Sequence, residues 1–198
     1  MRWLEIAGVI TGLIYLWLEY RADIRLWVAG IIMPAIYIPV YYTSGFYADA
    51  GVNVCYLLAG LYGWMFWRGR RSRDNAAGTS GGANHSRLPI SRTPRRMWLP
   101  MFLIFIAIFA ALALLLTRFT DSTVPYGDGF TTALSIVALW MLSRKYVEQW
   151  LIWVAVDAVC SGLYIYKGLH PTAGLYALYA VIAVFGYVKW KKGLATNT

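Results

Sequence analysis

One carboxylic acid of this sequence lies where a charged side chain is expensive. Asp157 is at the centre of the apolar run 147–166, which is long enough to cross a lipid bilayer as a helix. Lys and Arg lie only near the ends of such runs, so the sequence offers Asp157 no obvious cation. We therefore expect Asp157 to be protonated, to be hydrogen-bonded to Ser or Tyr hydroxyls, or to face a cationic ligand. The alternative is a structural role, as a polar contact that holds helices together.

The neighbours of Asp157 form a stripe along one side of the expected helix. Trp150, Trp153, Asp157, Ser161 and Tyr164 recur at helical spacing. An aromatic stripe of this kind more often packs in a helix bundle than binds a ligand. Next to a carboxylate without a cation, however, Trp150 and Trp153 are suited to enclose a flat cation by stacking and cation–π attraction.

Polar side chains on two other apolar segments are candidates to complete a site. The segment 128–143 begins with Asp128 and then presents hydroxyls along one face, and the segment 47–67 carries Asn53 and Tyr56 about one turn apart. Such groups also serve as hydrogen bonds between neighbouring helices. The predicted substrate-binding residues are Asn53, Tyr56, Thr131, Ser135, Trp150, Trp153, Asp157 and Tyr164.

Two prolines are expected to act as hinges. Pro34 and Pro39 lie within the apolar run 26–42, where a proline frees a backbone carbonyl and permits a kink. Prolines are also common in membrane helices without that role.

The composition indicates that the chain is a membrane protein, so membrane-spanning helices must position these residues. Of the 198 residues, 60% are apolar or aromatic and only 14% are charged, whereas soluble domains carry about 25% charged residues. The aromatic content of 17% is typical of residues gathered at a lipid–water boundary. No signal-peptide cleavage site follows the first apolar run, which is therefore expected to stay part of the fold. Seven spans are predicted, at residues 3–20, 26–42, 47–67, 97–117, 128–143, 147–166 and 172–190.

The cations divide unequally between the two sides of these spans. Fifteen Lys and Arg residues fall on one side, including all eight arginines from Arg68 to Arg96, and three fall on the other. The positive-inside rule places the crowded side in the cytoplasm, so the N-terminus is predicted outside and the C-terminus inside. The segment 68–96, rich in Gly, Ser and Arg, is expected to be a flexible cytoplasmic loop.

The chain contains an internal repeat. An offset of 123 residues aligns the first three spans with the last three without a gap and gives twelve identities, among them Trp27 with Trp150 and Trp67 with Trp190. One extra helix lies between the halves, so both repeats run in the same direction. This predicts an all-α, 3+1+3 parallel repeat like that of SWEET-type sugar transporters, with a site between the repeats. The predicted units are repeats at 1–67 and 126–190, a basic loop at 68–96, a linking helix at 97–117 and a tail at 191–198.

Motifs for common enzymes do not occur in the sequence. There is no GxxxxGK[ST] loop, HExxH or GxSxG motif, the two cysteines are isolated, and the two histidines are far apart. We therefore predict a protein that is not an enzyme and has no metal, no cofactor and no nucleic-acid partner. The sequence does not decide whether the chain forms a homo-oligomer.

Several stretches resemble the PnuC family of bacterial vitamin transporters. They are WLEYRADIRLW, GFYADAG, LYGWMFW, RFTDSTVPYGDGFTTALSIVALWMLSRKYVEQWLIW and YIYKGL, and the likeness covers nearly the whole chain outside the segment 68–96. The resemblance implies a seven-helix, SWEET-like protein of the bacterial inner membrane. It also implies facilitated uptake of a vitamin precursor that a cytosolic kinase then traps by phosphorylation.

The resemblance also bears on the site and the substrate. The family's WxxW pair falls on Trp150 and Trp153, while members that carry nicotinamide riboside have Gln at Asn53 and Asn at Asp157. Nicotinamide riboside is the substrate that the family implies by default. The shorter amide and the added negative charge favour thiamine, which a branch of the family carries, as the alternative; riboflavin is a third family substrate.

Two other classes of function stay open from the sequence. In one, the chain is a proton-coupled carrier in which Asp157 titrates. In the other, it is a membrane scaffold whose repeat is only structural.

Overall fold

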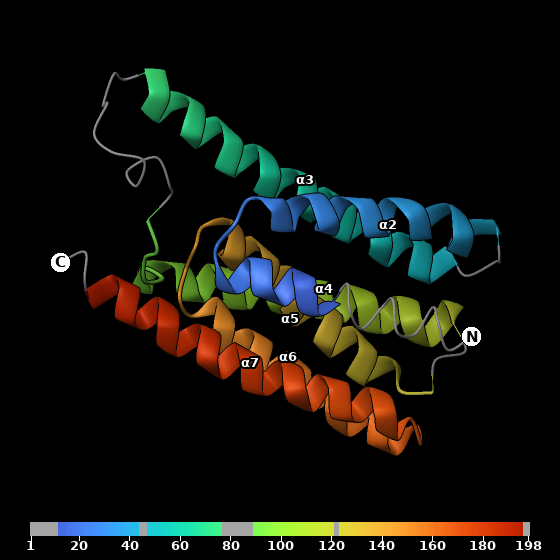
Figure 1. Cartoon of the computed structure of the whole chain (residues 1–198). Coiled ribbons are helices and arrows are strands. Elements are labelled where there is room, and N and C mark those ends of the chain that lie inside the picture. Colours follow the sequence, from blue (N-terminus) through green and yellow to red (C-terminus); the bar gives the residue numbers. More distant parts are fainter. Residues whose placement is uncertain (1–11, 44–46, 77–88, 121–122, 196–198) are drawn as a thin grey trace.

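The chain folds into a bundle of α-helices (Figure 1). The computed structural model describes residues 12–43, 47–76, 89–120 and 123–195, of which residues 12–20 form the first helical segment. The helices that follow are α2 (Arg25–Thr43), α3 (Tyr47–Ala76), α4 (Arg95–Phe119), α5 (Pro125–Ser143), α6 (Gln149–Tyr166) and α7 (His170–Ala195). These seven helical segments confirm the predicted all-α class. The start of the predicted first span, residues 3–11, lies outside the described residues.

Two antiparallel helix pairs flank the middle of the bundle. α2 packs along α3 and α6 packs along α7, while α5 contacts α3, α4 and α6. Among the described helices, α2, α4, α6 and α7 are long and apolar enough to cross a membrane. Large side chains such as Leu99, Phe102 and Phe185 are exposed on these helices, as expected for contact with lipid.

α5 runs through the interior, which explains its weak hydropathy. Its buried residues are mainly small or hydroxyl-bearing, because neighbouring helices approach it closely: Gly129, Thr131, Ala133, Ser135, Val137, Ala138, Met141, Leu142 and Ser143. A helix that faces protein on most sides does not need the large apolar side chains of a lipid-facing helix.

The repeat in the sequence is matched by repeated geometry. Trp27 meets Trp67 edge to face, with ring centroids 5.6 Å apart and an angle of 86°, and Trp150 meets Trp190 with the same two values. A glycine makes room for each pair, because a methyl group added at Gly63 would collide with the Trp27 ring. Gly186, the repeat equivalent of Gly63, allows the same approach of Trp150.

The two halves also hold each other by equivalent hydrogen bonds. The Trp67 indole N–H donates to the Ser143 carbonyl oxygen at 2.7 Å, and the Trp190 indole N–H donates to the Tyr20 carbonyl oxygen at 3.3 Å. The offset of the repeat relates one bond to the other. These bonds join the ends of α3 and α7 to the ends of α5 and of the helix at 12–20.

The segment 68–96 is only partly the flexible loop that the sequence predicts. α3 continues to Ala76 and α4 begins at Arg95. Between them, Ser91 exchanges backbone hydrogen bonds with residues 145 and 147, and the Thr93 amide and hydroxyl both donate to a Glu148 carboxylate oxygen at 2.8 Å. The prediction was therefore wrong for residues 68–76 and 89–96, where helix propagation and this carboxylate order the chain. Residues 77–88 lie outside the described residues.

Candidate substrate-binding site

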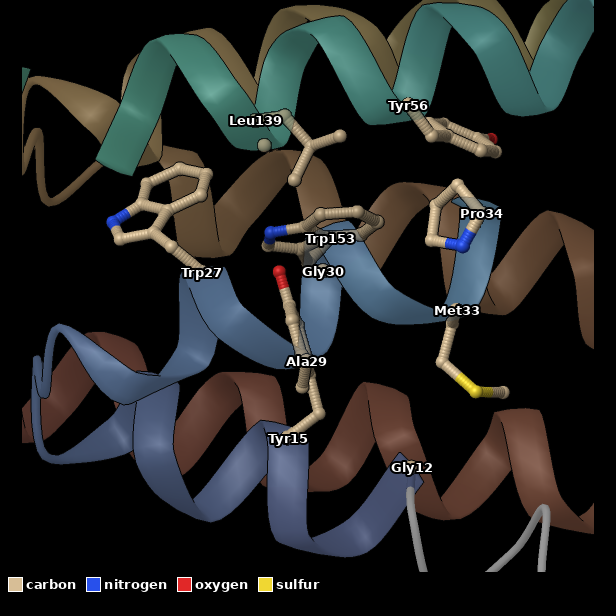
Figure 2. Close-up of a pocket in the computed structure, with 11 residues that line it drawn as sticks. Gly12, Tyr15, Trp27, Ala29, Gly30, Met33, Pro34, Tyr56, Leu139 and Trp153 are labelled. Carbon is tan, nitrogen blue, oxygen red and sulfur yellow. The ribbon is translucent and has the colours of Figure 1, made fainter. Parts of the chain in front are cut away.

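A cavity of about 320 Å³ lies between the two halves of the bundle. This volume is at the lower end of the range for small-molecule sites. Its walls are mostly apolar and aromatic, and they come from the helix at 12–20 and from α2, α3, α5 and α6 (Figure 2). The lining residues are Gly12, Tyr15, Trp27, Ala29, Gly30, Met33, Pro34, Tyr56, Gly60, Leu139 and Trp153.

Three residues predicted from the sequence meet at this cavity. Trp153 of α6, Tyr56 of α3 and the predicted hinge Pro34 of α2 all line it, and Figure 2 shows the Trp153 ring near the middle of the view. Asp157 lies one helical turn after Trp153 and is only 6% exposed. An aromatic face and a buried carboxyl group thus lie together on α6, as the stripe predicted.

Two members of the predicted stripe lie elsewhere. Trp150 is 0% exposed and packs in the core against Trp190, and it does not line the cavity. Tyr164, near the end of α6, stacks on Tyr176 of α7 with ring centroids 5.1 Å apart. A direct role for either in binding stays a prediction.

The predicted hydroxyls of α5 bond mainly to their own helix. Thr131 donates to the carbonyl oxygens of Gly127 and Asp128, and Ser135 donates to that of Thr131 at 2.8 Å. The Tyr56 hydroxyl faces Ser135, so this part of α5 still approaches the cavity wall.

The remaining predicted residues are not on the cavity wall. Asn53 is partly buried on α3 and has a polar or ring contact. Pro39 is exposed on α2, and its carbonyl oxygen accepts the Thr43 hydroxyl at 2.8 Å. α2 is one continuous helix through both Pro34 and Pro39.

The sequence did not identify several wall residues of the first half. Tyr15, Trp27 and Met33 line the cavity together with Leu139 of α5. The repeat carried a signal for one of them, because Trp27 is equivalent to Trp150. For Tyr15, Met33 and Leu139 the sequence holds no comparable signal, since apolar and aromatic residues are frequent in every span.

Two buried polar side chains beside the cavity were also missed. Glu19 is 1% exposed and Gln149 is 0% exposed, although the sequence places both near span ends. Glu19 lies against the Gln149 side chain and the Trp153 indole. The repeat indicated that both positions are buried, since the equivalent of Glu19 is Leu142 and that of Gln149 is Leu26, and both leucines are fully buried.

Neither buried carboxyl group forms an ion pair with a Lys or Arg of the described residues. Lys167 instead pairs with Asp128, at 3.2 Å. Asp157 is close enough to Glu19 for the two groups to interact electrostatically. The cavity therefore has an aromatic wall, and the two buried carboxyl groups each lie one helical turn from a wall residue, Tyr15 or Trp153, without lining the cavity themselves.

The chain is similar to known transporters. A sequence profile described as "Nicotinamide mononucleotide transporter" matches residues 2–192. The chain is 23% identical to the nicotinamide riboside transporter PnuC of Escherichia coli (strain K12), over 96% of this chain and 85% of that protein. It is 25% identical to the riboflavin/roseoflavin transporter RibM of Streptomyces davaonensis, over 95% of this chain and 84% of that protein.

The fold is also that of a solved structure. The crystal structure of the vitamin B3 transporter PnuC superimposes with a TM-score of 0.71 over 99% of this chain and 83% of that chain, at 23% identity. At this identity the likeness shows the fold, and it confirms the SWEET-like class predicted from the repeat.

Proposed function

The chain belongs to the nicotinamide mononucleotide transporter family, and from this premise we propose that it imports a cationic, aromatic vitamin precursor by facilitated diffusion. Membership makes it a multi-pass membrane vitamin transporter and not an enzyme. We place its basic end in the bacterial cytoplasm, where a kinase would trap the substrate.

The observation that carries the substrate class is the pair of buried carboxyl groups one helical turn from the wall of an aromatic cavity. Asp157 and Glu19 are both buried and make no ion pair within the described residues, and Trp153 presents its ring between the two halves. Burying an unpaired carboxylate is costly. A pyridinium or thiazolium ring in the cavity would offset this cost and stack on Trp153.

Nicotinamide riboside and thiamine are the two candidate substrates. The nicotinamide riboside transporters among the relatives favour the first. The negative charge of Asp157 and the short side chain of Asn53 favour thiamine. Riboflavin is less well suited, because it is uncharged and larger than both, whereas the cavity has a volume of about 320 Å³.

Thermal stabilisation of the purified protein tests the proposal. A ligand that binds the folded state raises the melting temperature by mass action. We expect nicotinamide riboside or thiamine to raise it in a concentration-dependent way, and riboflavin to raise it less. The absence of a shift with both cations, at concentrations up to the millimolar range, would contradict the proposed substrate class.

A proton-coupled carrier is the second candidate, and the same two carboxyl groups favour it. Uptake into cells during the first seconds distinguishes the two mechanisms. A proton ionophore should leave initial uptake unchanged if transport is facilitated diffusion. An immediate loss of uptake would establish proton coupling.

A further inference from the structure

Four buried polar atoms near the cavity make no hydrogen bond of ordinary length in the described part of the chain. They are Glu19 Oε1, Gln149 Nε2 and Oε1, and Trp153 Nε1, and Glu19 lies close enough to Gln149 and Trp153 only for weak hydrogen bonding within the cluster. Buried polar groups of folded proteins are nearly always paired, and each exception calls for an explanation. At a binding site, the explanation is a ligand that supplies the missing partners.

The four atoms belong to one cluster, which we call the polar triad (Glu19, Gln149 and Trp153). Glu19 lies against the other two side chains. Each end of the triad is one helical turn from the cavity wall, because Glu19 follows Tyr15 and Gln149 precedes Trp153. Figure 2 shows the Tyr15 hydroxyl directed toward the Trp153 indole. The triad therefore lies next to the cavity and reaches its wall through Trp153.

The second position that the repeat relates to this one shows that the fold does not need a polar cluster here. The repeat equivalents of Glu19, Gln149 and Trp153 are Leu142, Leu26 and Gly30. Leu26 and Leu142 are both 0% exposed and belong to the same apolar core. Both positions are formed by residues of both halves, and one is packed with apolar side chains whereas the other holds polar ones. Packing alone does not account for this difference.

We propose that the polar triad is a subsite for a planar substrate group that carries an N–H donor beside an acceptor, as a carboxamide or an aminopyrimidine does. A carboxylate oxygen only accepts, an indole N–H only donates, and the Gln149 amide does both. This set can pair with both atoms of such a group. The inference rests on the proposed function, and it assigns Glu19 and Gln149 as specificity-determining residues.

The triad should also reject a substrate that carries a carboxylate in place of the amide. A carboxylate offers no donor to Glu19 and brings a like charge against it, while the buried atoms of the triad stay unpaired. Sites that hydrogen-bond a substrate group discriminate strongly against analogues that lack it. Because the triad atoms are buried, contact with the ligand requires movement of the side chains around them.

Binding to a matched ligand pair tests the subsite. Titration calorimetry of the full-length protein compares nicotinamide riboside with nicotinic acid riboside, in which a carboxylate replaces the carboxamide. We expect the amide ligand to bind at least about tenfold more tightly. Glu19→Gln should reduce that ratio at least about fivefold by removing the like charge. Asp128→Asn is the matched control, since its carboxylate pairs with Lys167 outside the triad, and it should leave the ratio unchanged.

A second variant keeps the inference testable if Glu19→Gln fails to fold. Gln149→Leu introduces the residue that the chain itself carries at Leu26. We expect affinity for the amide ligand to fall several-fold while the melting temperature stays equal or rises, because an unpaired buried amide is removed. A residue with a merely structural role would lose stability together with affinity.

The outcomes separate this inference from the proposed function. Unchanged ligand ratios in both variants, with normal binding by the native protein, would overturn the subsite and leave the transporter proposal intact. If the native protein binds neither nicotinamide riboside nor thiamine, the proposed function fails and the subsite fails with it.

Discussion

Trp150 and Trp153 are three residues apart on one helix, yet the structure gives them different surroundings, and we expect their substitutions to have different effects. Trp150 is 0% exposed and fills the space left by Gly186, whereas Trp153 lies on the cavity wall. Trp150→Ala should therefore remove core packing and cost about 3–5 kcal/mol of stability. For a chain of this length, that corresponds to a fall of roughly 6–20 °C in melting temperature.

Trp153→Ala should act mainly on binding. A tryptophan that stacks on a desolvated cation contributes ~1–2 kcal/mol, so the dissociation constant should rise about 5- to 30-fold. Trp153→Phe should lose less, since an aromatic face remains. Differential scanning fluorimetry gives the melting temperatures, and calorimetry with the ligand found in the stabilisation screen gives the affinities.

The comparison between the two tryptophans can refute the reasoning. If Trp150→Phe weakens binding as much as Trp153→Phe while the melting temperature is unchanged, both residues contact the substrate, as the sequence alone predicts. The site would then extend beyond the cavity, toward α7. If Trp153→Ala changes stability but not affinity, Trp153 is a packing residue and the cavity is not the binding site.

Three further predictions follow from the site, the charges and the packing. Asp157→Asn should weaken thiamine binding by about 1–3 kcal/mol and leave nicotinamide riboside binding nearly unchanged. The ratio of the two affinities should therefore shift in favour of nicotinamide riboside, and an unchanged ratio would leave Asp157 with a structural role. A reporter fused after Thr198 should be active only in the cytoplasm, and periplasmic activity would overturn the predicted orientation. Gly186→Ala should destabilise the protein by about 1–3 kcal/mol in thermal unfolding, because the added methyl group would collide with the Trp150 ring. Gly174→Ala is the control, since a methyl group added at Gly174 would meet open space, and an equal loss of stability there would contradict the packing argument.

The helices could be predicted because a membrane span can be recognised from its own stretch of sequence. A span must be apolar along its own length, and the repeat then fixes how the halves relate, so α2, α4, α6 and α7 could be placed within a few residues. α3 extends nine residues beyond its predicted end at Trp67, because its last turns continue past the apolar run. Hydropathy carries no information about that extension.

The site could be predicted only in part, because burial at the ends of spans depends on contacts between the halves. Trp153 and Asp157 stand out within one apolar run. Glu19 lies at a sequence boundary that resembles a solvated helix end, but in the fold it is buried, with Gln149 and Trp153 of α6 against it. A comparison of each residue with its repeat equivalent would have revealed it, since Leu142 occupies the matching position.

The paired indole hydrogen bonds constrain how the molecule can move. Transport requires the two halves to separate at each end in turn. At the end where Trp67 bonds to Ser143 and Trp190 bonds to Tyr20, a separation of the halves has to break both bonds, at 2.7 and 3.3 Å. The near-symmetry of the fold thus doubles the number of indole hydrogen bonds that hold this end closed.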